Sequence, residues 1–176
     1  MAVAKSTAER GGLNGCLVTR AYFWHIRRVT DTIPEQLAII AGRGVYPRLL
    51  AESARQQGVR RVVALAFKGE TERRIGDVVD QVYWLNLGAL TALLEAVKAS
   101  GVRDAVMAGQ ITPTNLFRVR MDRPMLDLLG RLKERNAETI FGAVGEELHK
   151  IGVTLRPASS FMESTMPTAG CLSQRS

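Results

Sequence analysis

The sequence predicts an α/β fold: a Rossmann-like, doubly wound and mainly parallel sheet of about five strands with helices on both faces. Short, continuously apolar runs alternate with amphipathic segments from residue 37 onward. Unbroken hydrophobicity within a strand is typical of a parallel sheet that helices cover on both sides. Glycine or proline separates most of these segments, which marks the turns between them.

The first apolar run, 37–41, predicts a buried strand that ends at the loop Gly42-Arg43-Gly44. Pro47 can begin the next helix, since proline lacks an N–H that the first helical turn leaves unpaired anyway. We expect this helix over 48–57, with Gly58 as its stop and an inner face formed by Leu49, Leu50, Ser53 and Ala54.

The same alternation continues along the chain. Residues 61–67 predict a second strand and 80–85 a third, with a polar loop at 68–71 between them. Residues 87–99 predict an amphipathic helix that Gly101 ends, with an apolar face of Leu90, Leu93, Leu94 and Val97. The remaining segments predict a strand at 104–108, helices at about 124–135 and 138–151, and a brief strand at 153–155.

The loop after the first strand is the sharpest local pattern. Its glycines would let a backbone approach a ligand closely, and the helix that follows offers unpaired N–H groups to a phosphate. A purely structural turn explains the same residues. An NAD site is disfavoured, because the dinucleotide pattern needs Gly or Ala three residues after Gly44, where Pro47 stands, although Glu70 falls near the position of a ribose-binding acid.

Right-handed crossovers place the loops after the first and fourth strands at the same edge of the sheet. Gln110, in the second of these loops, either hydrogen-bonds a ligand or caps its own loop. Lys68 either meets an anion or belongs to a solvated turn. The predicted substrate-binding residues at this rim are Gly42, Arg43, Gly44, Pro47, Lys68 and Gln110.

Composition limits the class of protein. The chain has 176 residues, enough for one domain, and 24 Lys and Arg against 17 Asp and Glu give a net charge of +7. The basic residues are scattered and lack any nucleic-acid-binding pattern, so we expect no nucleic acid. Arg118 and Arg123 either meet a phosphate or membrane surface or form a solvated face. No apolar run reaches 18 residues, so we expect no transmembrane helix.

The sequence carries no recognisable catalytic apparatus. It contains no nucleophile elbow, no zinc-protease motif, no P-loop and no compact carboxylate cluster for magnesium, so we assign no catalytic or metal residue. Cys16 and Cys171 lie far apart, which suits neither a disulfide framework nor a zinc site and fits a reducing compartment.

Several segments together resemble the N-terminal domain of a known family. They are LAIIAGRGVYP (37–47), FKGET (67–71), LGAL (87–90), VMAGQ (106–110), RPMLDLL (123–129) and AGCLS (169–173). In combination and order they are similar to LpxI, the UDP-2,3-diacylglucosamine pyrophosphatases of lipid A biosynthesis. The resemblance covers roughly residues 37–173.

The resemblance implies a cytoplasmic enzyme, peripheral at the inner membrane of a Gram-negative-type bacterium. Such enzymes use a divalent metal, Mg in this expectation, to hydrolyse UDP-2,3-diacylglucosamine to UMP and lipid X. The family's acidic catalytic residues belong to a second domain, so we expect this chain to bind UDP-diacylglucosamine or lipid X and to be inactive alone. The alternative is a non-catalytic nucleotide- or glycolipid-binding module.

These expectations divide the chain into three parts. Residues 1–36 are expected to be an N-terminal extension, either disordered or preceding the true start. Residues 37–156 form the Rossmann-like domain, and 157–176 form a linker or tail that stops before the second domain. A half that normally packs on a partner domain exposes apolar surface, which favours a homo-oligomer.

Overall fold

The fold is seen in a computed structural model that describes residues 33–111, 119–134 and 136–162. In these residues, five parallel strands form one sheet in the order β3-β2-β1-β4-β5. The strands are β1 (Gln36–Ala41), β2 (Arg61–Phe67), β3 (Gln81–Leu85), β4 (Asp104–Ala108) and β5 (Thr154–Arg156). This order confirms the predicted doubly wound fold.

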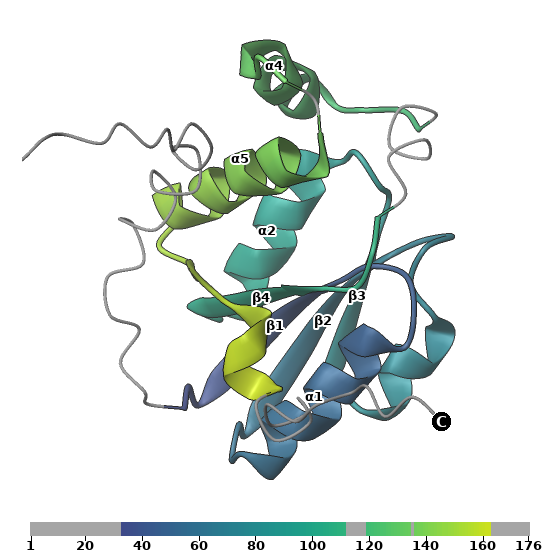
Figure 1. The fold of residues 1–176 in the computed structure, drawn as a ribbon, viewed down its shortest axis with the longest axis vertical. Coiled ribbons are helices and arrows are strands. Elements are labelled where there is room, and N and C mark those ends of the chain that lie inside the picture. Colours follow the sequence, from purple (N-terminus) through teal and green to yellow (C-terminus); the bar gives the residue numbers. More distant parts are fainter. Residues whose placement is uncertain (1–32, 112–118, 135, 163–176) are drawn as a thin grey trace, which may run out of the picture. The chain divides into compact units, whose positions relative to one another are not determined.

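Helices cover both faces of this sheet (Figure 1). One face carries α1 (Tyr46–Gln56) and the short 3-10 helices η1 (Arg73–Asp77) and η2 (Ala158–Phe161). The other carries α2 (Leu90–Ser100) and α5 (Ala137–Lys150), and α4 (Arg123–Arg131) packs against α2. The chain runs from β1 to β3 on one side of the sheet and crosses to β4 on the other, so the winding reverses between β1 and β4.

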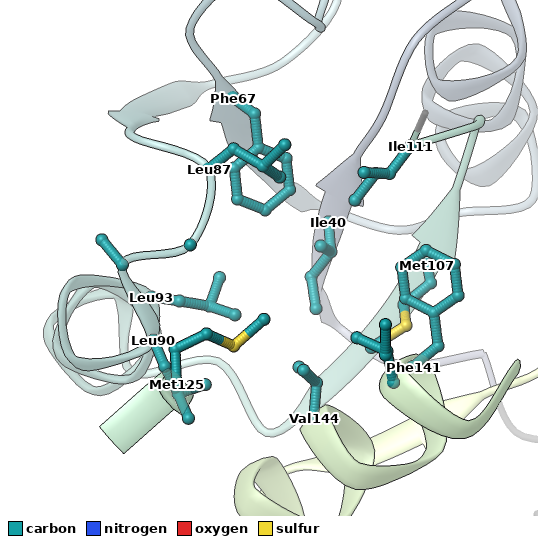
Figure 2. Close-up of a pocket in the computed structure, with 13 residues that line it drawn as sticks. Ile40, Phe67, Leu87, Leu90, Leu93, Met107, Ile111, Met125, Phe141 and Val144 are labelled. Atoms are coloured by element: carbon teal, nitrogen blue, oxygen red, sulfur yellow. The ribbon is translucent and has the colours of Figure 1, made fainter. Parts of the chain in front are cut away.

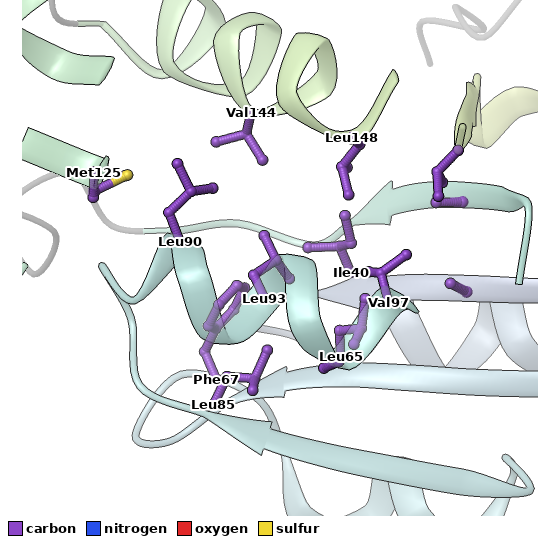
Figure 3. Close-up of a cluster of buried hydrophobic side chains, with 14 of the residues drawn as sticks. Ile40, Leu65, Phe67, Leu85, Leu90, Leu93, Val97, Met125, Val144 and Leu148 are labelled. Carbon is purple, nitrogen blue, oxygen red and sulfur yellow. The ribbon is translucent and has the colours of Figure 1, made fainter. Parts of the chain in front are cut away.

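Strand β1 divides the core into its two halves. The buried hydrophobic residues between the sheet and α1 form the α1 cluster, and those between the sheet and α2 form the α2 cluster. Side chains of β1 alternate between the two faces, so Leu37 and Ile39 lie in the α1 cluster and Ala38 and Ile40 lie in the α2 cluster. Figure 3 shows the α2 cluster, in which Leu90 of α2 points toward α5, while Val144 and Leu148 of α5 point toward α2 and the sheet. The α2 cluster is the larger of the two halves.

The two edge strands are more exposed than the three central strands. Val82 and Tyr83 of β3 are half-buried and Trp84 is exposed, because β3 has a neighbouring strand only on its β2 side. Thr154 and Leu155 of β5 are exposed at the opposite edge for the same reason.

Helix boundaries also differ from the predictions in places. Leu49, expected on the inner face of α1, is 38% exposed, and Ala51 is buried in its stead. The helix expected over 124–135 ends at Arg131, because Leu132 adopts an extended backbone. The helix expected from residue 87 begins at Leu90, after Gly88 takes a positive φ of 87°.

The last described segment lies in the range expected to be a tail. Phe161 of η2 is nevertheless buried in the α1 cluster. Its carbonyl oxygen accepts hydrogen bonds from the Ser53 hydroxyl and, at 2.9 Å, from the Gln57 amide of the α1 C-terminus. The core therefore extends into the segment beyond residue 156.

Candidate functional site

The carboxyl ends of β1 and β4 meet where the winding of the sheet reverses. In open parallel sheets, ligands bind at this point, in the crevice outside the strand ends. The loops that leave the two strands are Gly42-Arg43-Gly44 and Gly109-Gln110, the two loops that the sequence predicts to lie together.

The two loops are joined by backbone hydrogen bonds. The Arg43 N–H donates to the Gln110 carbonyl oxygen at 2.6 Å, and the Gln110 N–H donates back to that of Arg43 at 3.1 Å. The Gly42 N–H donates to the Ala108 carbonyl oxygen at 2.7 Å. The main chain therefore closes the inner part of the crevice.

Two glycines permit this close approach. A Cβ at Gly42 would lie 2.6 Å from the Gln110 carbonyl oxygen. A Cβ at Gly109, whose φ is +90°, would lie 2.8 Å from the Arg43 carbonyl oxygen and 3.0 Å from the Pro47 ring. Contact between the loops explains both glycines without a ligand.

The outer part of this rim stays open. Gly44 has a φ of +96°, and nothing lies within 4 Å of a Cβ built on it. The Arg43 and Gln110 side chains are exposed, and α1 begins without a side-chain cap at Val45. An anion at this rim would meet one guanidinium, one amide and the start of a helix.

A second feature lies beside this rim, on the α2 face of the sheet. It is a cavity of about 60 Å³ within a wider hollow of about 660 Å³ that includes its open mouth. Side chains converge on it from the sheet, α2, α4 and α5 (Figure 2). Apart from Gly88, its lining is apolar: Ile40, Phe67, Leu87, Ala89, Leu90, Leu93, Met107, Ile111, Met125, Ile140, Phe141 and Val144. We call this hollow the apolar pocket.

Asp122 links the N-terminus of α4 to the N-terminus of α2. One carboxylate oxygen caps α4 by accepting from the Met125 N–H at 3.0 Å, and the other accepts from the Thr91 N–H of α2 at 2.7 Å. Partial burial alone would raise the pKa of Asp122, but the hydrogen bonds from Thr91 and Met125 outweigh it, and the pKa is lowered. This link places Met125 in the wall of the apolar pocket.

A capping box fixes the start of α5. The Asn136 side chain accepts from the Thr139 N–H at 2.8 Å, and the Thr139 hydroxyl accepts from the Asn136 N–H at 3.2 Å. The first turns of α5 then bring Ile140, Phe141 and Val144 to the apolar pocket. The sequence expectation of a helix at 138–151 is thereby confirmed, starting one residue earlier.

The structure groups only some of the predicted rim residues. Gly42, Arg43, Pro47 and Gln110 lie together, with Gly44 beside them. Lys68 lies apart from them, after β2, in a polar hollow with Gly69, Thr71, Arg73 and Trp84. Arg123 is exposed at the start of α4, whereas Arg118, Cys16 and Cys171 lie outside the described residues. Glu70 is 8% exposed, which removes it from the open rim where a ribose-binding acid would stand.

Sequence reasoning missed the apolar pocket. Its lining comes from six separate segments, and each of these residues reads as ordinary core in its own segment. A usable sign was the surplus of large apolar residues near the carboxyl ends of the strands, at Phe67, Leu87, Met107 and Ile111.

Neither a membrane-spanning helix nor a metal-binding cluster occurs among the described residues. No helix there is long and apolar enough to cross a membrane. No group of three or more His, Cys, Asp or Glu side chains in those same residues could hold a metal ion, so they do not fit the divalent metal that the resemblance implies.

The fold and the site define a Rossmann-like α/β domain with an apolar pocket beside a polar rim. Comparison with protein families gives a match to the family described as the LpxI N-terminal domain, over residues 36–165. The chain therefore belongs to the LpxI family, which places it in the context of lipid A biosynthesis. A search of curated proteins gives no match.

Proposed function

We propose that this chain is the glycolipid-binding domain of an LpxI-type UDP-2,3-diacylglucosamine pyrophosphatase. The observation that carries the proposal is the apolar pocket, which opens beside the polar rim at the carboxyl edge of the sheet. A ligand that suits both must be amphiphilic, with hydrocarbon for the pocket and phosphate or sugar groups for the rim. UDP-2,3-diacylglucosamine and lipid X have this chemistry.

The pocket is suited to an acyl chain because its walls offer no hydrogen-bonding side chain. Burial of hydrocarbon contributes about 0.8 kcal/mol for each methylene removed from water. A polar ligand group in the pocket would lose its hydrogen bonds to water without replacement, which costs a few kcal/mol. The acyl chain therefore belongs in the pocket, and the polar head belongs outside it, where Arg43 and Gln110 form the rim and Lys68 follows β2.

Hydrolysis of the pyrophosphate requires activation of water and stabilisation of charge on the phosphates. The described residues hold no cluster suited to a metal, so we derive no metal-dependent step from them. We infer that this chain binds and orients the glycolipid and does not release UMP by itself. Catalysis with Mg would then use residues of the family's second domain.

We further infer that the domain works on the cytoplasmic surface of the inner membrane of a Gram-negative-type bacterium. Helix α4 supports contact with a lipid surface, because Leu126 is 55% exposed on it and Arg123 and Arg131 are exposed at its two ends. Arginine beside an exposed leucine suits an interface between anionic headgroups and acyl chains. Leu126 is equally suited to contact with a second copy of the chain.

The second candidate function is a binding module without catalysis. The specific observation in its favour is that the described residues contain a built pocket yet no metal-binding cluster. The two candidates share the ligand and differ in whether a partner domain completes a hydrolase. UMP release on addition of the family's second domain from a related enzyme would support the hydrolase.

Binding of the full chain to UDP-2,3-diacylglucosamine in detergent micelles, measured by calorimetry, tests the proposal. Val144→Phe narrows the pocket from α5 and should weaken binding at least about tenfold, since an overfilled pocket excludes the acyl chain. The matched control is Leu155→Phe, which adds an aromatic ring on β5 outside the pocket and should leave binding unchanged. Equal affinity of both variants would contradict acyl binding in the pocket.

A further inference from the structure

A polar hollow lies on the opposite face of the sheet from the apolar pocket. Its volume is about 600 Å³, within a wider open space of about 970 Å³, and it is lined by Lys68, Gly69, Thr71, Arg73 and Trp84. Side chains alternate along a strand, so Trp84 shares a face with Val82, which packs beside η1, while Leu85 belongs to the α2 cluster. We call this hollow the Trp84 groove.

The turn after β2 is firmly held. The Lys68 N–H donates to the Leu85 carbonyl oxygen at 2.9 Å, which extends the pairing of β2 with β3 by one residue and keeps Lys68 beside Trp84. The Thr71 hydroxyl accepts from the Phe67 N–H at 2.9 Å and donates to the carbonyl oxygen of Ala41 at the end of β1. The turn that borders the groove is therefore hydrogen-bonded to both neighbours of β2, namely β1 and β3.

Three of the side chains that line the groove, those of Lys68, Arg73 and Trp84, are exposed and accessible to a ligand. Trp84 is 38% exposed, although indole is among the largest apolar side chains. Lys68 and Arg73 are exposed, and among the described residues neither forms an ion pair or a side-chain hydrogen bond. Glu70, the acid of the same turn, is buried and does not line the groove.

An exposed indole that shares a hollow with two cations suits a ligand with a planar ring and a phosphate. We propose that the Trp84 groove binds a nucleoside phosphate, with the base stacked on Trp84 and the phosphate held by Lys68 and Arg73. Stacking on an aromatic side chain accepts any base, because every base has a π face. The cations favour the phosphorylated form of the ligand over the free nucleoside.

Consecutive residues at the end of β2 line the apolar pocket and the groove. Phe67 lines the pocket, and Lys68, the next residue, lines the groove on the other face. Their Cα atoms are about 3.8 Å apart, as in any consecutive pair. A ligand with an acyl chain at one end and a nucleotide at the other can occupy both by crossing this edge. The choice of uridine as the base rests on the proposed function.

The test follows Trp84 fluorescence in the full chain. Trp24→Phe leaves Trp84 as the only tryptophan of the two in the sequence. Saturable quenching by UMP is expected, with uridine and inorganic phosphate each binding roughly tenfold more weakly, since each lacks one of the two contacts. Added salt should weaken UMP binding, because the phosphate contacts are exposed and screened.

Variants assign the contacts to named side chains. Arg73→Gln and Lys68→Gln should each weaken UMP binding about tenfold, and Trp84→Leu, measured by calorimetry, by roughly tenfold. Arg74→Gln is the matched control, because Arg74 follows Arg73 on η1, is also exposed and does not line the groove. It should leave UMP affinity unchanged.

Several results would overturn the assignment. They are the absence of quenching by UMP, equal affinity for UMP and inorganic phosphate, or equal effects of the Arg73 and Arg74 substitutions. UMP carries no acyl chain, so the two proposals fail separately. Glycolipid binding that depends on Val144 but not on Trp84 overturns the groove alone. UMP binding that depends on Trp84, with Val144→Phe harmless to glycolipid binding, overturns the acyl pocket alone.

Discussion

The rim between β1 and β4 and the apolar pocket beside it are built in different ways. At the rim the backbone comes together, and the Arg43 and Gln110 main chains fill the space between the strand ends. At the pocket the backbone stays apart, and side chains from distant segments leave a hollow between them. Glycines in a strand-end loop therefore indicate close backbone approach, and the partner in that approach can be another loop instead of a ligand.

The largest expected effect on the free energy of unfolding comes from a substitution in the wall of the apolar pocket. Leu93→Ala removes a side chain that is 5% exposed and enlarges an existing hollow, and we expect a loss of about 2–5 kcal/mol in the free energy of unfolding. Leu94→Ala is its matched control, because Leu94 is the next residue of α2 and only half-buried, and should cost about 1 kcal/mol or less. Urea denaturation measures both; equal losses would show that the wall is not part of the core.

Alanine substitutions at two glycines test whether the two loops of the rim contact each other. Gly109→Ala forces a Cβ toward the Arg43 carbonyl oxygen at a positive φ, so the two loops must separate, at a cost of about 1–3 kcal/mol. Gly44→Ala has a similar φ but open space around the new Cβ, so it carries only the conformational penalty of roughly 1–2 kcal/mol. Thermal unfolding compares the two variants. A larger loss for Gly44→Ala would contradict the contact between the loops.

The smallest of the three effects concerns Asp122, which joins α4 to α2 at the pocket. Asp122→Ala removes the cap of α4 and the acceptor of the Thr91 N–H, and we expect a loss of about 1 kcal/mol at neutral pH. The lowered pKa of Asp122 means that its carboxylate stabilises the fold at any pH above the unfolded value of about 4. That contribution is lost as the pH falls through the lower, folded value.

The stability difference between the parent chain and Asp122→Ala should therefore be constant from neutral pH to about 5 and shrink below about 4. Asp122→Asn is the control, because its single side-chain oxygen keeps one of the two hydrogen bonds and does not titrate. Urea denaturation across this range measures the difference. A gap that widens toward acid would contradict a lowered pKa.

Much of the fold could be predicted from the sequence because its central strands are buried on both faces. Residues 37–41, 62–67 and 105–108 are apolar without interruption, and the strands predicted around them became β1, β2 and β4 with shifts of at most one residue. The edge strand β3 was located, yet its exposure was not foreseen, since apolar residues such as Trp84 give no sign of which strand ends the sheet. Leu49 was misplaced because the buried face of α1 follows Leu50, Ala51 and Ala54 at helical spacing, and Leu49 projects from another side of the helix.

The candidate site could be predicted only where it depends on topology. Right-handed crossovers brought the loops of Gly42 and Gln110 together, as expected from the order of the segments. No local pattern showed that these loops would bond to each other, because that depends on the register between β1 and β4. The pocket and the Trp84 groove arise from tertiary packing of segments far apart in the sequence, so they needed the structure.

The most direct test of the central claim is to locate the acyl chain. The full chain would be photolabelled with a UDP-2,3-diacylglucosamine analogue that carries a diazirine in one acyl chain, and the labelled peptides identified by mass spectrometry. We predict labels on pocket residues such as Phe67, Met107 and Val144, which unlabelled glycolipid removes by competition. Labels confined to the exposed Leu126 or Leu155, or unaffected by competition, would contradict an acyl-binding pocket.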